Sequence, residues 1–276
     1  MIATVRAKGG REAMVQTADF TQPNKAHRLA EKAYQPGRNV MNRPLANNIS
    51  ILAFDVFGTV VDWHQSIMRE VRSMNLDVDP DRFALAWRAG YVPAMQKVMS
   101  GQLGWTLIDD LHRMILDDLL DTFKVTHLSD EEKRHLNKAW HRLDAWPDTV
   151  AGLTRLKSRY TICTLSNGNI GLLANMAKRA ALPWDCILSA EVFRKYKPDP
   201  ATYLGVAQVF DVSPGEVMLV AAHQDDLAHA RAAGLKTAYI ERPLEYGLSK
   251  QKDVSANPDN TFHAKDLIQL AELLGC

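Results

Sequence analysis

Asp55 is the first residue of the sequence whose type and position suggest chemistry. It ends an apolar, β-branched run over residues 49–54, which is typical of a strand buried in the centre of a parallel sheet. Sheets of this kind bind their ligands at the carboxyl ends of the strands. A lone aspartate at such a place is more often a helix cap, so Asp55 needs partners before it indicates a site.

Polar side chains also follow two other predicted strands. Because parallel strands end at one edge of a sheet, we expect these side chains to meet Asp55 in a single crevice. Helix capping alone does not explain polar residues at three strand ends. The additional residues are Ser166 and Asn167 after the strand predicted over 160–165, and His223 to Asp226 after the strand predicted over 217–222.

A lysine is predicted to reach the same crevice from a loop. Lys197 stands in a segment that Pro198 and Pro200 make stiff, and Lys195 competes with it for this role. The Lys-Pro-Asp context favours Lys197. An ammonium group near Asp55 would keep that carboxylate ionised.

The remainder of the chain predicts the scaffold for these groups. Beyond residue 145, predicted strands and helices alternate, and each helix is short enough to serve as a crossover between parallel strands. We therefore predict that residues 49–62 and 145–276 form an α/β core with a doubly wound, Rossmann-like parallel sheet.

Two segments do not follow this alternation. Residues 63–144 have apolar positions at helical spacing and no strand-like pattern, which predicts an inserted, all-helical cap. Residues 1–48 hold eight Lys and Arg against three Asp and Glu, and they lack the apolar stretch of a secretory signal. We predict that they form a flexible, basic N-terminal extension.

Composition limits the classes of function. The 276 residues carry 33 Lys and Arg against 32 Asp and Glu, so no overall field favours nucleic acid as a partner. No apolar run approaches the ~20 residues of a membrane span, and we expect no membrane association. The three cysteines have no metal-ligand spacing and are typical of reduced thiols in a cytoplasmic protein. Apolar surface on the cap is compatible with a homodimer.

The order and spacing of the polar residues resemble the motif series of the haloacid dehalogenase superfamily. The resemblance covers residues 50–275, cap included, and implies that Asp55 is a nucleophile. The motifs that carry it are Asp55-Val56-Phe57-Gly58-Thr59, Leu165-Ser166-Asn167-Gly168, Tyr196-Lys197-Pro198-Asp199, and Asp226.

Two departures separate the chain from the phosphatases of that superfamily. Phe57 replaces the acid that protonates the leaving alcohol, and Ala222 replaces an acid that helps to hold Mg²⁺. The chain resembles type II, or L-2-, haloacid dehalogenases in both losses. Arg88 also matches their cap arginine. The resemblance therefore implies dehalogenation of a small-molecule substrate without a metal ion or other cofactor.

The implied reaction is a two-step hydrolysis of short 2-haloalkanoic acids to 2-hydroxy acids. Asp55 displaces the halide to form an alkyl ester, which water then hydrolyses. The resemblance implies catalytic roles for Asp55, Thr59, Lys197, His223 and Asp226. It implies substrate-binding roles for Val56, Phe57, Arg88, Ser166, Asn167 and Tyr203.

Electrostatics makes these roles coherent, because nucleophile and substrate are both anions. Lys197 would offset their repulsion. Ser166 and backbone N–H groups at the start of the following helix would hold the substrate carboxylate. Arg88 would stabilise the departing halide. Thr59 would orient Asp55 through its hydroxyl, while Asp226, with Lys197 and Asn167, would position the water.

Several alternatives stay open at this point. The first is a Mg²⁺-dependent small-molecule phosphatase that uses the same Asp55. Two weaker ones are a phosphonate hydrolase, for which no cap lysine stands out, and a non-catalytic binding protein. His223 is either a general base for ester hydrolysis or a structural residue. With Asp225 it makes one wall polar, which would suit short acids, including fluoroacetate-like ones.

Overall fold

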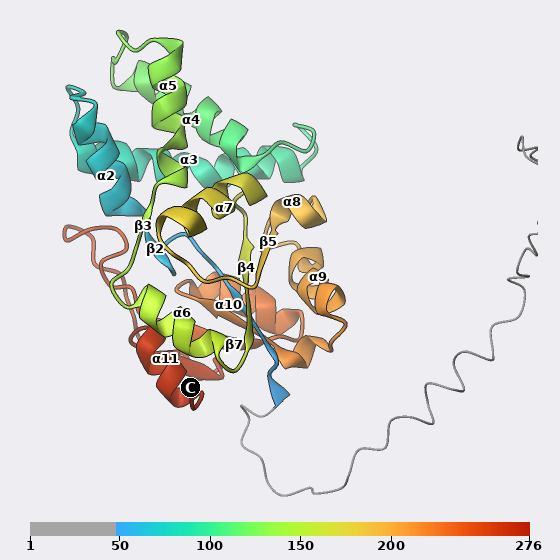
Figure 1. The fold of residues 1–276 in the computed structure, drawn as a ribbon. Helices are drawn as coiled ribbons and strands as arrows, with labels where there is room; N and C mark the ends of the chain where they lie inside the picture. The colour runs from blue at the N-terminus through green and yellow to red at the C-terminus, as the bar shows by residue number, and fades with distance from the viewer. Residues whose placement is uncertain (1–47) are drawn as a thin grey trace, which may run out of the picture. The chain divides into compact units, whose positions relative to one another are not determined.

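A computed structural model describes residues 48–276 (Figure 1). The basic extension predicted over 1–48 lies outside the described residues, apart from Asn48. Within 48–276, no helix combines the length and the apolar character that crossing a bilayer requires. The three cysteines are free thiols, and Cys163 is buried.

The core of the fold is a six-stranded parallel sheet with the strand order β5-β4-β1-β6-β7-β8. The central strand β1 pairs with β4 on one side and with β6 on the other. The doubly wound parallel sheet expected from the sequence is thereby confirmed. The strands are β1 (Ile51–Phe54), β4 (Thr161–Ser166), β5 (Cys186–Ser189), β6 (Val217–Ala221), β7 (Lys236–Ile240) and β8 (Phe262–Ala264).

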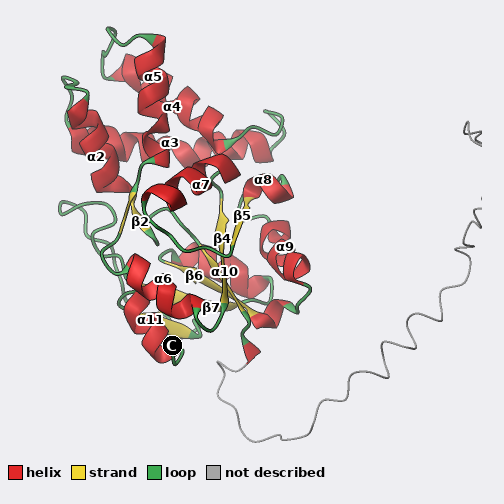
Figure 2. Ribbon diagram, viewed as in Figure 1, coloured by secondary structure: helices red, strands yellow, loops and turns green. Residues whose placement is uncertain are grey.

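Helices cover both faces of this sheet (Figure 2). Leu52 and Phe54 of β1 belong to the same buried cluster as helices α6, α7 and α11, whereas Ile51 and Ala53 belong to a second cluster with α9 and α10. Burial of one large apolar side chain contributes about 1.5–3 kcal/mol, so both faces of β1 stabilise the fold. The helices are α6 (Thr149–Lys157), α7 (Ile170–Arg179), α8 (Ala190–Phe193), α9 (Pro200–Phe210), α10 (Gln224–Ala232) and α11 (Leu267–Leu273), with a 3₁₀ turn η3 (Pro214–Glu216).

The last strand corrects one detail of the sequence interpretation. The alternating pattern beyond residue 145 predicts a final helix over residues 264–274, but residues up to Ala264 form β8 and α11 begins only at Leu267. A three-residue strand at a sheet edge is too short to show a period of two. Its pairing with β7 is what makes it a strand.

Four helices and a 3₁₀ turn separate two short antiparallel strands, β2 (Val61–Asp62) and β3 (Asp144–Ala145). Side-chain caps fix helix starts in this segment: Asp62 Oδ1 accepts from Gln65 N–H at 3.0 Å, and Ser129 forms a capping box with Glu132. The elements are α2 (Trp63–Ser73), α3 (Pro80–Met99), α4 (Ile108–Thr122), α5 (Asp130–Asn137) and η2 (Lys138–His141).

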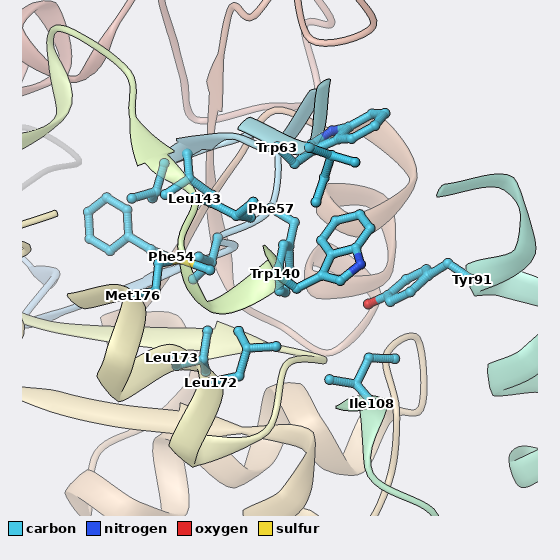
Figure 3. Packing of buried hydrophobic residues seen from close by; sticks show 14 of the residues in the cluster. Phe54, Phe57, Trp63, Tyr91, Ile108, Trp140, Leu143, Leu172, Leu173 and Met176 are labelled. Atoms are coloured by element: carbon cyan, nitrogen blue, oxygen red, sulfur yellow. The ribbon is translucent and has the colours of Figure 1, made fainter. Parts of the chain in front are cut away.

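An aromatic cluster joins this helical segment to the sheet. The indole of Trp140 lies beside Phe57, with Trp63 packed against it (Figure 3). The ring centroids of Trp140 lie 5.9 Å from Phe57, 6.3 Å from Trp63 and 4.5 Å from His112. Aromatic pairs at such separations contribute about 0.5–1.5 kcal/mol beyond area burial. The loop after β1 and the helical segment therefore share one core.

Candidate active site

Asp55 lies directly after β1 with its carboxylate held from both sides. The side chain of Thr59 donates to Asp55 Oδ2 at 2.8 Å, and Lys197 Nζ lies 3.3 Å from Oδ1. The Thr59 oxygen also accepts the Ala222 N–H at 2.9 Å. One hydroxyl thus ties Asp55 to the end of β6 and fixes its orientation. Gly58, at φ +86°, allows the tight turn that brings Thr59 back toward Asp55.

Lys197 joins Asp55 to a second carboxylate. Its Nζ lies 2.6 Å from Asp226 Oδ2, and the phenol of Tyr203 donates to Asp226 Oδ1 at 2.7 Å. The N–H of Lys197 donates to Asn167 Oδ1 at 2.8 Å, which fixes the loop to the end of β4. The structure therefore brings six of the residues identified from the sequence into one connected network.

The charges in this network stabilise one another. Burial alone would raise the pKa of Asp55, but Lys197 and His223 outweigh it and hold that pKa below its usual range. Burial alone would lower the pKa of Lys197, but Asp226 and Asp55 raise it. Asp55 is therefore an ionised carboxylate beside a permanent cation, although only 9% of its surface is exposed. These are the properties of a nucleophile that attacks without first losing a proton.

His223 bridges Asp55 and a carboxylate that the sequence reasoning missed. Its Nδ1 lies 3.1 Å from Asp55 Oδ2, and its Nε2 lies 2.8 Å from Glu245 Oε1. Glu245 is fully buried and has Lys252 Nζ 2.6 Å from its other oxygen. Burial would lower the pKa of His223, but Glu245 and Asp55 raise it to about 9. Burial would raise the pKa of Glu245, but His223 and Lys252 lower it to about 2.

Glu245 comes from the chain that follows β7, another strand ending at this edge of the sheet. Polar residues after three other strands were predicted to line the site because ligands bind at strand ends. The same argument applies to Glu245, which stands a few residues farther from the end of its strand. Lys252, on the same connection, has no pattern in the sequence that marks it.

The loop after β4 differs in one respect from the expectation. The Ile170 N–H donates to Glu191 at 2.7 Å, and the Gly168 N–H donates to Ser166 Oγ at 3.2 Å. These two amides already have protein acceptors, so a substrate carboxylate would have to displace Glu191 or Ser166 to bind them. The buried hydroxyl of Ser166 is still a donor on this side.

Arg88 lies outside the hydrogen-bonded network and rests on aromatic rings. Its guanidinium carbon is 4.4 Å from the centroid of Tyr91 and 5.7 Å from that of Trp63. Such cation–π contacts hold an arginine without neutralising it. A cavity of about 430 Å³ lies beside it, with a second cation in its wall. The lining residues are Leu85, Arg88, Ala89, Val92, Tyr246 and Lys250.

Val56 and Phe57 line the turn after Asp55 and are buried, at 1% and 4% exposure. The ring of Phe57 packs against Trp140, so Phe57 helps to shape the site but has no proton to donate. Asp225, by contrast, is exposed at the start of α10. At this strand end the polar group that contacts Asp55 is His223, and the polar wall expected from Asp225 stays a prediction.

The residues around Asp55 do not fit the magnesium ion that phosphatases of the haloacid dehalogenase superfamily hold. The ammonium group of Lys197 stands within 3.3 Å of both Asp55 and Asp226, where a divalent cation would meet a positive charge. Ala222 offers no side-chain oxygen at the end of β6. Mg²⁺ requires near-octahedral oxygen coordination, which these residues do not provide. Within residues 48–276, no cluster of three metal-binding side chains is found.

Comparison with known proteins agrees with this geometry. Residues 49–234 match the family model of haloacid dehalogenase-like hydrolases. The crystal structure of an L-2-haloacid dehalogenase is 44% identical, with a TM-score of 0.78 over 82% of this chain and 99% of that one. A defluorinating L-2-haloacid dehalogenase is 43% identical, with a TM-score of 0.80 over 86% and 99%. The (S)-2-haloacid dehalogenase 4A of Burkholderia cepacia is 29% identical over 75% of this chain and 91% of its own length.

Proposed function

The chain belongs to the haloacid dehalogenase-like hydrolases, and we propose that it hydrolyses the carbon–halogen bond of short 2-haloalkanoic acids to give 2-hydroxy acids. The observation that carries this proposal is the Lys197 ammonium, which lies 3.3 Å from the Asp55 carboxylate and 2.6 Å from that of Asp226. It makes Asp55 an ionised, oriented nucleophile and takes the place of a metal ion as the local positive charge.

In the first step, Asp55 attacks C2 of the substrate. A carboxylate oxygen forms the new C–O bond as the C–halogen bond breaks, and the halide departs with the bonding electrons. Two unit charges 4 Å apart repel by about 4 kcal/mol at an effective dielectric constant of 20. Lys197 offsets that repulsion at Asp55, and Arg88, unpaired with any carboxylate in residues 48–276, is the cation proposed for the halide.

In the second step, water attacks the carboxyl carbon of the Asp55 ester. Asp226 accepts the proton, because its carboxylate stands in the same network at the end of the sheet. The bond between the ester carbon and the alkyl oxygen then breaks, and the leaving oxygen takes that proton from Asp226. The second proton of the water leaves Asp55 to solvent and restores the carboxylate. Asn167 accepts a hydrogen bond from the Lys197 N–H and so keeps the Lys197 loop in place beside Asp55 and Asp226.

Phe57 favours this reaction over phosphate ester hydrolysis. An alcohol leaving from phosphorus needs a proton from a nearby acid, and Phe57 is a hydrocarbon ring packed on Trp140. A halide leaves without a proton, so the same residue has no cost for dehalogenation. The phosphatase alternative therefore lacks both its acid and its metal site.

For the substrate we propose a short acid with its carboxylate on the Ser166 hydroxyl. The 43% identical structure is described as defluorinating, so fluoroacetate belongs among the substrates to test. We propose no resident cofactor, nucleic acid or membrane partner. A cytoplasmic location and a homodimer stay predictions.

The test is halide release by the purified protein with chloroacetate and 2-chloropropionate, in the presence and absence of EDTA. We expect release that EDTA does not change and that Asp55→Asn abolishes. Release that depends on added Mg²⁺, or hydrolysis of p-nitrophenyl phosphate at a higher rate than dehalogenation, would contradict the proposal.

A further inference from the structure

The two oxygens of Asp55 have different surroundings. Oδ1 has one cation near it, Lys197 Nζ at 3.3 Å. Oδ2 accepts from the Thr59 hydroxyl at 2.8 Å and lies 3.1 Å from His223 Nδ1. An oxygen that already has two partners is less free to form a new bond, so Oδ1 is the attacking atom. Oδ2 then becomes the carbonyl oxygen of the ester.

His223 carries a proton on each ring nitrogen in the free enzyme. Nδ1 faces Asp55 and Nε2 faces Glu245, and ionised carboxylates only accept hydrogen bonds. A neutral imidazole can donate from one nitrogen alone, so one of the two contacts would then bring two acceptors together. The cation satisfies both contacts, in agreement with its raised pKa. In the free enzyme His223 is therefore a hydrogen-bond donor to both carboxylates rather than a proton acceptor.

We propose that His223 and Thr59 form an oxyanion site for Asp55 Oδ2 during hydrolysis of the ester, and that Glu245 is the positioning residue that holds His223 for this task. The inference rests on the proposed function, since it concerns the second step of that reaction. As water adds to the ester carbon, negative charge develops on Oδ2. The Thr59 O–H and the His223 Nδ1–H point at this atom and stabilise the charge.

Glu245 suits a positioning role rather than one of direct contact with substrate. It is fully buried, and Trp63 Nε1 lies 3.3 Å from the same oxygen that His223 contacts. Lys252 Nζ lies 2.6 Å from the other oxygen. These partners fix the direction of the carboxylate, so the imidazole between Glu245 and Asp55 has one orientation. A Cβ on Gly58 would lie 2.2 Å from Glu245 Oε1, so the tight turn after Asp55 leaves room for this carboxylate.

The step balances without any further reagent. The water oxygen bonds to the ester carbon, its proton passes to Asp226, and the charge rests on Oδ2 between Thr59 and His223. When the tetrahedral intermediate collapses, the bond to Oδ1 breaks. The 2-hydroxy acid leaves with Oδ1 and the proton from Asp226, and the water oxygen stays in Asp55. The second proton of the water leaves the Asp55 carboxyl group to solvent, which restores the carboxylate.

The test separates the two steps by rapid quench with chloroacetate, followed by intact-protein mass spectrometry. For His223→Gln and Glu245→Gln we expect a burst of one chloride per active site within a few-fold of the wild-type rate, then turnover slowed about 100-fold, with the ester as the main species. Slowing of the burst itself without ester accumulation would overturn the inference. If wild-type protein releases chloride but never forms an ester, the proposed function fails instead.

His263 provides a matched control, because its Nε2 pairs with Glu241 at 2.7 Å on the β7–β8 edge of the same sheet. His263→Gln should leave both phases unchanged. The second readout is the pH at which the rate of ester hydrolysis falls on the alkaline side of its pH profile. The charged groups that face His223 are Asp55 and Glu245, with Lys197 and Lys252 behind them. In Glu245→Gln this fall in rate should occur at lower pH, and a fall at the wild-type pH would contradict the positioning role. His223→Gln keeps the test valid if Glu245→Gln does not fold.

Discussion

The phenol of Tyr203 donates a hydrogen bond of 2.7 Å to Asp226 Oδ1. This contact fixes the carboxylate whose other oxygen holds Lys197. The Tyr203 side chain is thus connected to the nucleophile through Asp226 and Lys197, and it sets the geometry of the cation beside Asp55.

Replacing Tyr203 by Phe should lower kcat about 3- to 10-fold with little change in KM. The reason is that a hydrogen bond of this kind contributes about 0.5–1.5 kcal/mol and this one orients catalytic groups rather than substrate. Steady-state kinetics with 2-chloropropionate provide the measurement. Tyr160→Phe, whose hydroxyl donates at 3.4 Å to Leu274 on the far side of the core, is the control and should be unaffected. A loss confined to KM would assign Tyr203 to substrate binding alone.

Lys197→Met should reduce the rate of the chloride burst by about 10²–10³-fold. Without the ammonium, two carboxylates face each other in a buried site, and loss of one partner of a buried pair costs about 3–5 kcal/mol. Burst kinetics and urea unfolding measure the two effects. Lys195→Met is the control, because within residues 48–276 the Lys195 ammonium pairs with Asp199 alone, at 3.7 Å, and is half-exposed. Equal losses in both variants would show that the competing lysine also serves the reaction.

Arg88→Gln should lower kcat for chloroacetate about 100-fold, because the variant lacks the cation that stabilises the negative charge developing on the departing halide. The stacked arrangement on Tyr91 predicts that Arg88→Lys restores only part of the rate, since lysine lacks the planar group that stacks. Lys250→Gln, in the wall of the same cavity, is the control for a general loss of positive charge. A complete rescue by lysine would reject the role of stacking.

The rate of ester hydrolysis should fall at alkaline pH, with a midpoint no higher than the free-enzyme pKa of about 9, because the ester lacks the Asp55 charge that helps to raise the pKa of His223. His223 loses its proton near that pH, and with it one donor to Asp55 Oδ2. The same shift affects stability: the folded pKa exceeds the ordinary value of 6.5, so the contribution of His223 is complete below pH 6.5 and is lost as pH rises through 9. Rapid-quench rates and thermal unfolding from pH 6 to 11 test both effects, with His223→Gln as the variant that lacks them.

Glu245 should govern part of the acid unfolding. Its folded pKa of about 2 lies below the ordinary value of 4.5, so its stabilisation is complete above pH 4.5 and disappears as pH falls toward 2. Wild-type protein should therefore lose more stability over that range than Glu245→Gln, which has no proton to bind there. Parallel stability curves for the two proteins would contradict the assignment.

The sequence predicted the residues whose position follows from topology. Asp55, Asn167 and Asp226 stand at strand ends, and parallel strands bring such ends together whatever the loops do. Lys197 was predicted from its proline-stiffened loop and Thr59 from the motif resemblance, and both contact the Asp55 carboxylate.

The remaining features depend on long connections, where the sequence has no period to interpret. Glu245 and Lys252 stand on the chain between β7 and β8, and tertiary packing alone brings them to His223. Arg88 stacks on Tyr91 because both side chains lie on one face of α3. The periodicity of the sequence predicts that such a face packs against another element, but it does not predict a cation–π contact. Asp225 is exposed on the first turn of α10, whereas the adjacent Asp226 contacts Lys197, and the sequence alone does not show which of the two carboxylates faces the site.

The most direct measurement is a single turnover of 2-chloropropionate in H₂¹⁸O with enzyme in excess, followed by mass spectrometry of the peptide that contains Asp55. Attack of Asp55 on carbon and of water on the ester predicts one ¹⁸O in the Asp55 carboxylate and none in the released 2-hydroxy acid. Label in the product alone, with an unlabelled Asp55 peptide, would show that water attacks the substrate directly and would contradict the account.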